Sequence, residues 1–248
     1  MTTYAVPTMG RRVASTVRVH LSNPWALLYT PALITLGVFG LNFAIWHIVL
    51  FAAGDNPLEP DAFDYNGGGS WVMFYLVVVA VQAMNQTFSF TVGLGSTRRD
   101  YYLGTSLIFV MLSVVFGVGL ALLAGVERLT DGWGVGGRFF APSVLQTIPV
   151  WELAMMYTLA MLLLTFVGAA CGATFVRWAA TGLIVFLGSL LVLAVAIVFL
   201  IVWGGWWQPI ADFFSARTPW EIALLSLPIT LIAGLGGFAL LRRATPKG

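Results

Sequence analysis

Apolar residues gather into long runs along this chain, and short polar segments separate the runs. A helix needs about 20 consecutive apolar residues to cross the hydrocarbon core of a bilayer. Six runs reach that length. The sequence therefore predicts an all-α integral membrane protein of six transmembrane helices, which form a single transmembrane domain over residues 1–248. We expect the spans at about 25–53, 71–94, 101–125, 150–176, 179–203 and 220–241.

The segment 10–23, ahead of the first span, has a narrower apolar pattern. Val13, Val17 and Leu21 recur at four-residue spacing, while arginines and a serine occupy other parts of the helical surface. Helices of this kind lie in the headgroup layer of a membrane rather than crossing it. We expect an N-terminal interfacial amphipathic helix here.

Capping residues mark the start of two predicted spans. Asn23 can offer a side-chain oxygen to the first turn of the first span, and Pro24 has the backbone angle of a first helical position. Thr218 and Glu221 have the spacing of a capping box at the start of the last span. Both helix starts coincide with the beginning of an apolar run.

The composition agrees with a membrane environment. Hydrophobic residues make up 59% of the chain and charged residues 9%, whereas soluble domains carry roughly 25% charged residues. Lys and Arg near span ends resist translocation and so mark the cytoplasmic side. Nine of the twelve fall on one side, which predicts a protein of the cytoplasmic membrane with both termini in the cytoplasm. The nine are Arg11, Arg12, Arg18, Arg98, Arg99, Arg177, Arg242, Arg243 and Lys247, and the other three are Arg128, Arg138 and Arg217.

Residues that could carry catalysis or hold a metal are scarce. The chain has two histidines, His20 and His47, and a single cysteine, Cys171. Lys247 is the only lysine, and no glycine-rich phosphate-binding loop occurs. We therefore expect no enzyme activity, no metal site and no bound cofactor in this chain. The formal net charge of +2 gives no reason to expect a nucleic-acid partner.

A polar face interrupts the second predicted span. Gln82, Asn85 and Gln86 are spaced i, i+3 and i+4, so they share one face of a helix near mid-membrane depth. Amides in hydrocarbon need hydrogen-bond partners, so this face should look into protein or a wet cavity. Two interpretations remain open: the amides bind neighbouring helices, or they line a substrate path. Asn42 in the first span fits either.

The turn between the second and third predicted spans is the most informative segment. Two adjacent arginines face the predicted cytoplasmic side, and Thr97-x-x-Asp100 can cap the helix that follows. The turn is either an ordinary basic anchor or a docking site for a cytoplasmic partner. Its residues are Gly95, Ser96, Thr97, Arg98, Arg99, Asp100 and Tyr101.

The run GLGSTRRDYYLGT around this turn resembles the corresponding loop of small six-helix bacterial ABC exporter permeases, the type 2 class. An amphipathic N-terminal segment, six spans with both ends inside, and an aromatic-rich segment from Trp203 to Trp220 resemble that family over the whole chain. The loop motif itself is short. Two arginines lead the turn here, where many relatives carry a Glu-rich turn followed by glycine.

The resemblance implies that Ser96 to Tyr101 face a separate ABC ATPase, which would bind ATP and magnesium. It also implies a second permease subunit, identical or not, and export of an amphipathic, drug-like or lipid-like substrate; membrane lipid is a further expected partner. A non-transporting scaffold or accessory subunit is an alternative. A secondary carrier would need an ionisable residue at mid-membrane, and apart from His47 the interiors of the predicted spans contain none.

Overall fold

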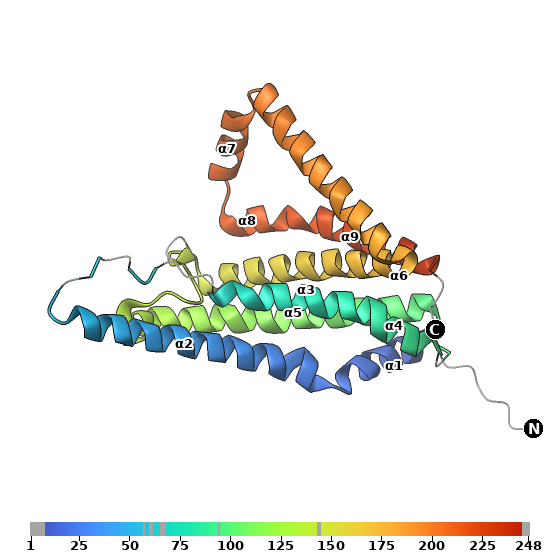
Figure 1. The fold of residues 1–248 in the computed structure, drawn as a ribbon, viewed down its shortest axis with the longest axis horizontal. Coiled ribbons are helices and arrows are strands. Elements are labelled where there is room, and N and C mark those ends of the chain that lie inside the picture. The colour runs from blue at the N-terminus through green and yellow to red at the C-terminus, as the bar shows by residue number, and fades with distance from the viewer. Residues whose placement is uncertain are drawn as a thin grey trace, which may run out of the picture.

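The computed structural model describes residues 8–56, 58–59, 62–64, 68–93, 95–142 and 145–244. All regular secondary structure in these residues is helical (Figure 1). The helices are α1 Met9–Leu21, α2 Thr30–Ala53, α3 Trp71–Gln82, α4 Phe88–Gly93, α5 Arg98–Leu129, α6 Val150–Trp203, α7 Trp207–Ser215, α8 Pro219–Leu224 and α9 Ser226–Arg242. Shorter helical turns are the π-helical η1 Trp25–Tyr29, η3 Ala83–Thr87 and η4 Gly132–Gly136, and the 3₁₀ turn η2 Gly68–Ser70.

Five helical stretches in the described residues are long and apolar enough to cross a membrane. They are Trp25–Ala53, Trp71–Gly93, Arg98–Leu129, Val150–Trp203 and Pro219–Arg242. Large apolar side chains cover their outer surfaces: Phe51 is 89% exposed, Ile232 71% and Ile184 70%. Such a surface is stable in hydrocarbon and costly in water. The fold is all-helical, as predicted, and suits an α-helical membrane protein.

The fourth and fifth predicted spans form one helix, α6, without an intervening loop. A straight helix of 54 residues would be about 81 Å long, against roughly 30 Å for the hydrocarbon core. Ala179 breaks the helix, with φ 57° and ψ −156°, in a region of backbone angles that favours glycine. The predicted boundary is therefore in the right place, but the chain turns there at a single residue.

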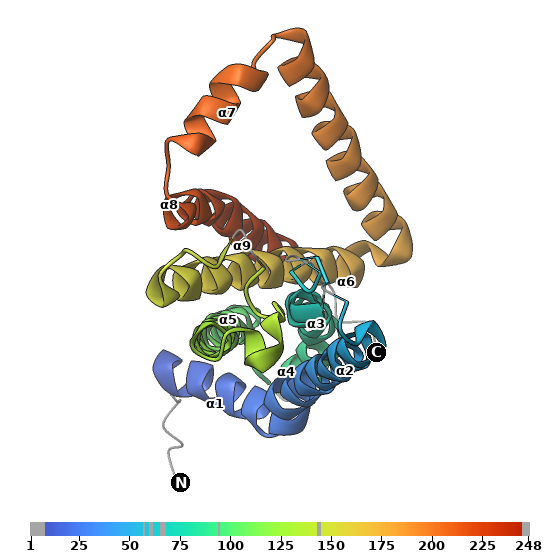
Figure 2. The same cartoon turned by 90° about the vertical axis from the view of Figure 1, so that its left-hand side faces the viewer.

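The two limbs of α6 diverge at this break (Figures 1 and 2). The first limb, 150–178, packs in the bundle against α3 and α5, and the second limb, 180–203, leaves it. α7 lies beyond the end of the second limb, and α8 and α9 return to the first limb, so that these helices outline a triangle. Apart from Phe186, every residue from 184 to 200 is exposed.

Small residues let the first limb of α6 approach α3 and η3 closely. A Cβ added to Gly168 would lie 2.8 Å from the backbone oxygen of Val77, and one added to Gly172 would lie 2.8 Å from Cβ of Met84. Only glycine permits such an approach between membrane helices. This contact holds η3, which carries part of the predicted amide face, against the bundle.

α5 extends beyond the predicted span 101–125 at both ends, since it runs from Arg98 to Leu129. The predicted span ends ahead of Glu127, the first acidic residue after the apolar run. The side chain of Glu127 is nonetheless fully buried in the last turns of α5. The loop that follows α5 folds back and supplies hydrogen bonds to this carboxylate, so polarity here does not mark a helix end.

The remaining predicted helix starts are confirmed. The backbone N–H of Ala26 donates to Oδ1 of Asn23 at 3.4 Å. At the start of α8, the N–H of Thr218 donates to Oε2 of Glu221 at 2.8 Å, which is one half of the predicted capping box. The predicted amphipathic helix is present as α1 and packs beside α5 (Figure 2).

Candidate functional site

Local hydrogen bonds shape the turn that connects α4 to α5, hereafter the 95–101 turn. Gly95 has a φ of +90°, a left-handed angle that residues with a side chain rarely adopt. The N–H of Ser96 donates to the backbone oxygen of Thr91 and so closes the end of α4. The hydroxyl of Thr97 accepts from the N–H of Asp100 at 3.1 Å and donates to its carboxylate at 2.7 Å. The predicted Thr97-x-x-Asp100 cap is confirmed.

An ion pair joins the 95–101 turn to α1. Nε of Arg12 lies 2.6 Å from the carboxylate of Asp100, whose side chain is 3% exposed. Just beyond the pair the two helices touch directly, because a Cβ added to Gly104 would lie 2.6 Å from Cβ of Thr16. The amphipathic helix is thus packed and charge-paired against the start of α5, at the end of α5 that bears the predicted docking turn.

Three further hydrogen bonds connect the start of α5 to other helices. In each of them a side chain at the start of α5 donates to a backbone oxygen of η3 or α9. The bonds run from the hydroxyl of Tyr101 to Ala83, from the hydroxyl of Tyr102 to Gly234, and from the guanidinium of Arg98 to Arg242. A displacement of the 95–101 turn would therefore be transmitted to α1, η3 and α9.

The predicted coupling residues divide into an outward and an inward set. Gly95, Thr97 and Arg99 are exposed, and Ser96 and Arg98 are half-buried, so these five present a surface to a partner. Asp100 and Tyr101 are buried. Their side chains hold the turn in position and are not available for contact with another chain.

Two of the predicted path residues, Gln82 and Gln86, line a cavity of about 270 Å³ between α1, α3, η3 and α5. Within the described chain neither amide has a hydrogen-bond partner. The other polar side chains of this amide cavity come from His20, Asn23, Tyr75 and Thr87, and its apolar walls include Leu27, Val79, Ile108 and Phe109. The described lining thus combines neutral hydrogen-bonding groups with apolar surface.

A π-helical turn positions the two amides. Gln82 directly precedes η3 and Gln86 lies within it. A π turn adds one residue to a helical turn, and such insertions are frequent at functional sites. Tyr101 bonds to the backbone oxygen of Ala83, the first residue of η3. The same tyrosine therefore connects the 95–101 turn to the helix segment that carries the amides.

The other two predicted path residues lie elsewhere. Asn85 is half-buried but does not line the amide cavity. Asn42 is on α2, where its side-chain N–H donates to the backbone oxygen of Val38 at 2.9 Å. The structure thus brings together Gln82 and Gln86 and leaves Asn85 and Asn42 outside the cavity they form.

His20 is a cavity residue that the sequence reasoning placed only in the interfacial helix. It is buried, and its Nε2 lies 3.0 Å from the hydroxyl of Thr105 in α5. Burial lowers the pKa of His20 to about 4, so the imidazole is neutral at pH 7. His20 lies one helical turn after Thr16, which is also buried, so the two share the buried face of α1.

Comparison with protein-family models, with curated proteins and with solved structures found no match to this chain. Two features of the structure are candidate functional sites. One is an exposed basic turn whose buried side chains reach three other helices. The other is a neutral, partly polar cavity beside it.

Proposed function

We propose that this chain is the transmembrane permease subunit of an ATP-driven ABC-type exporter. The observation that carries the proposal is the 95–101 turn, which exposes Arg99 while neighbouring side chains contact α1, η3 and α9. The sequence has no phosphate-binding loop of its own. ATP and magnesium would be bound by separate ATPase subunits, and their movement against the turn would drive a rigid-body change in the bundle.

In this proposal α6 crosses the membrane twice, which gives six spans and puts both termini in the cytoplasm. Each limb of α6 exceeds the roughly 20 residues that a crossing requires. The break in α6 lies at the same end of the bundle as the start of α5 and the end of α9 (Figure 1). Arg98, Arg177 and Arg242 belong to this end, and that clustering of arginine supports its assignment to the cytoplasmic side of the cytoplasmic membrane.

The amide cavity supports a substrate path for an amphipathic, drug-like or lipid-like molecule. Its lining combines apolar side chains with neutral donors and acceptors, which suits a substrate of mixed polarity. At about 270 Å³ it is smaller than the roughly 300–1,000 Å³ of typical small-molecule sites. A second permease subunit, identical or not, would complete the path.

Co-expression with the P-loop ATPases of the same genome tests the proposal. The wild-type chain should retain an ATPase through purification in detergent. The double variant Arg98→Glu, Arg99→Glu should insert normally but lose it, because the charge on the exposed turn is reversed. Arg217→Glu, between α7 and α8, serves as the control and should retain the ATPase. If the wild-type chain retains none, or if the double variant retains as much as the control, the proposal fails.

A second measurement separates a permease from a non-transporting scaffold. Gln82→Ala with Gln86→Ala removes both amides from the cavity and should lower export of an amphipathic dye while leaving ATPase retention intact. Asn85→Ala is the matched control, since it removes an amide of the same helix outside the cavity. A scaffold would show no export by the wild-type chain, and equal export by all three chains would contradict the assigned path.

A further inference from the structure

A separate cavity at the corner of α6 carries several positive charges. It measures about 630 Å³ and lies between the break in α6 and the end of α9. Arg177, Arg242 and Arg243 line it, and we call it the arginine cleft. A neighbouring cavity of about 450 Å³ shares Arg242 and adds Arg99 from α5. Arginines from α5, α6 and the end of α9 thus meet at one corner of the bundle.

The positive charge of the arginine cleft is not neutralised within the described chain. No acidic residue is among the described residues that line it. The two ion pairs found in the described residues are Arg12 with Asp100 and Arg138 with Asp64, and neither involves the cleft. The guanidinium of Arg177 lies over the ring of Trp178, 4.3 Å from its centroid. Stacking of this kind occupies the face of a guanidinium and leaves its N–H edge for an anion.

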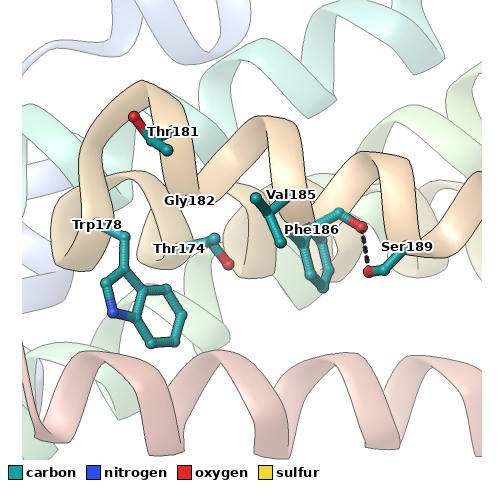
Figure 3. A pocket seen from close by; sticks show the side chains of 7 residues that line it. All are labelled: Thr174, Trp178, Thr181, Gly182, Val185, Phe186 and Ser189. Carbon is teal, nitrogen blue, oxygen red and sulfur yellow. Dashed lines mark hydrogen bonds between the residues drawn. The ribbon is translucent and has the colours of Figure 1, made fainter.

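An apolar groove of about 500 Å³ continues from the cleft along the second limb of α6 (Figure 3). The groove and the cleft share Thr174, Trp178 and Phe186, so the two adjoin at these residues. The side chains of Trp178 and Phe186 point from α6 toward α9. Leu187, Leu190 and Leu191 follow the groove on the same limb and are exposed, so this limb presents an apolar surface suited to lipid acyl chains.

We propose that the arginine cleft and the groove together bind one anionic phospholipid, with its phosphate at the arginines and an acyl chain against Trp178 and Phe186. The positive end and the apolar continuation match the two parts of such a molecule. A soluble anion would leave the groove uncovered, and an acidic peptide would place unpaired backbone groups against apolar walls. Basic pockets between membrane helices recognise anionic headgroups in this way. The site joins α6 to α9 and does not depend on transport.

Native mass spectrometry of the delipidated full-length chain in a neutral detergent tests the site. Phosphatidylglycerol should bind as a saturable ligand, and phosphatidylcholine, which is neutral overall, about tenfold more weakly. Each arginine near a lipid phosphate contributes roughly fivefold in affinity, so Arg177→Gln, Arg242→Gln and Arg243→Gln together should weaken phosphatidylglycerol binding on the order of a hundredfold. A control variant removes the same number of charges elsewhere and should change the affinity for phosphatidylglycerol by less than about threefold. It carries Arg11→Gln, Arg18→Gln and Arg217→Gln.

A variant of the groove tests the acyl-chain contact without a change of charge. Val185 lines the groove and is 66% exposed, so Val185→Trp fills the groove from an accessible position. The variant should weaken the binding of phosphatidylglycerol but not that of inorganic phosphate. Thermal unfolding of each variant, followed by tryptophan fluorescence, verifies that it is folded.

Four results would overturn the assignment. Equal affinity for phosphatidylglycerol and phosphatidylcholine would show that the arginines do not recognise the anionic headgroup. Unchanged phosphatidylglycerol affinity in the triple arginine variant would show the same. Inorganic phosphate binding as tightly as phosphatidylglycerol would indicate a soluble-anion site. A triple variant that keeps the lipid but loses a co-purified ATPase would make the cleft a protein contact instead.

Discussion

The structure predicts that one buried carboxylate, Glu127, holds the loop after α5 in place. Its oxygens accept hydrogen bonds from three backbone N–H groups, at 2.8, 3.0 and 3.1 Å, and from two side chains. The backbone donors belong to Phe139, Phe140 and Ala141, and the side-chain donors to Trp133 and Gln146. Glu127→Ala would leave three buried backbone donors without an acceptor.

A buried donor that loses its partner costs about 1–3 kcal/mol, so Glu127→Ala should lower the free energy of unfolding by roughly 3–6 kcal/mol once partial relaxation is allowed. Glu127→Gln keeps one acceptor oxygen and should cost roughly 1–3 kcal/mol. Denaturant unfolding in detergent, followed by tryptophan fluorescence, measures both losses. Limited proteolysis should show earlier cleavage in the loop after α5.

Glu152→Ala is the matched control for this prediction. Glu152 lies in the first turn of α6 and is half-buried, and no hydrogen bond from its side chain occurs within the described chain. Its interaction with the helix N-terminus is worth about 0.3–1 kcal/mol. If Glu127→Ala proves no less stable than Glu152→Ala, the carboxylate does not organise the loop as argued.

Three smaller perturbations test other contacts. Ala179→Gly should stabilise the fold by about 1 kcal/mol, because glycine adopts the observed backbone angles without strain. Ala180→Gly, in regular helix, should destabilise it by about the same amount. If thermal unfolding shows Ala180→Gly to be the more stable of the two, the backbone of α6 is not broken at Ala179. Gly104→Ala should push α1 away from α5 and lower stability by about 1–3 kcal/mol, and unchanged protection of α1 in hydrogen exchange would count against that. The folded-state pKa of His20, about 4, lies below the unfolded value of 6.5. The unfolded chain therefore takes up a proton first as pH falls, and roughly 2 kcal/mol of stability should be lost between pH 7 and pH 5. His20→Gln should remove that loss and His47→Gln should not.

The spans could be predicted because their signals are local. Run length sets which segments can cross a bilayer, and the caps at Asn23, Thr97 and Thr218 depend on residues within three positions of each other. The boundary between the fourth and fifth spans was predicted, but its form was not. Alanine at position 179 carries no turn preference, so no local signal indicates that the chain changes direction at a single residue.

The candidate site was predictable in part for the same reason. Helical spacing put Gln82 and Gln86 on one face, and they do share a cavity. His20 completes that cavity only because α1 packs on α5 at Gly104, far away in the chain. Glu127 has no local signal of its burial, because its five donors come from residues that follow it by six to nineteen positions. Contacts of that range have no periodicity to reveal them.

Site-specific cross-linking tests whether an ATPase docks on the 95–101 turn. In a Cys171→Ala background, Arg99→Cys places one thiol on the turn, and Leu129→Cys places one at the other end of α5, roughly 45 Å away by helix length. Leu129 is 89% exposed, so its thiol is equally accessible. With a short thiol-to-amine cross-linker and a co-expressed ATPase, we predict a cross-linked ATPase from Arg99→Cys alone. Cross-linking of the ATPase to Leu129→Cys, alone or as strongly as to Arg99→Cys, would show that the ATPase does not dock specifically on the 95–101 turn.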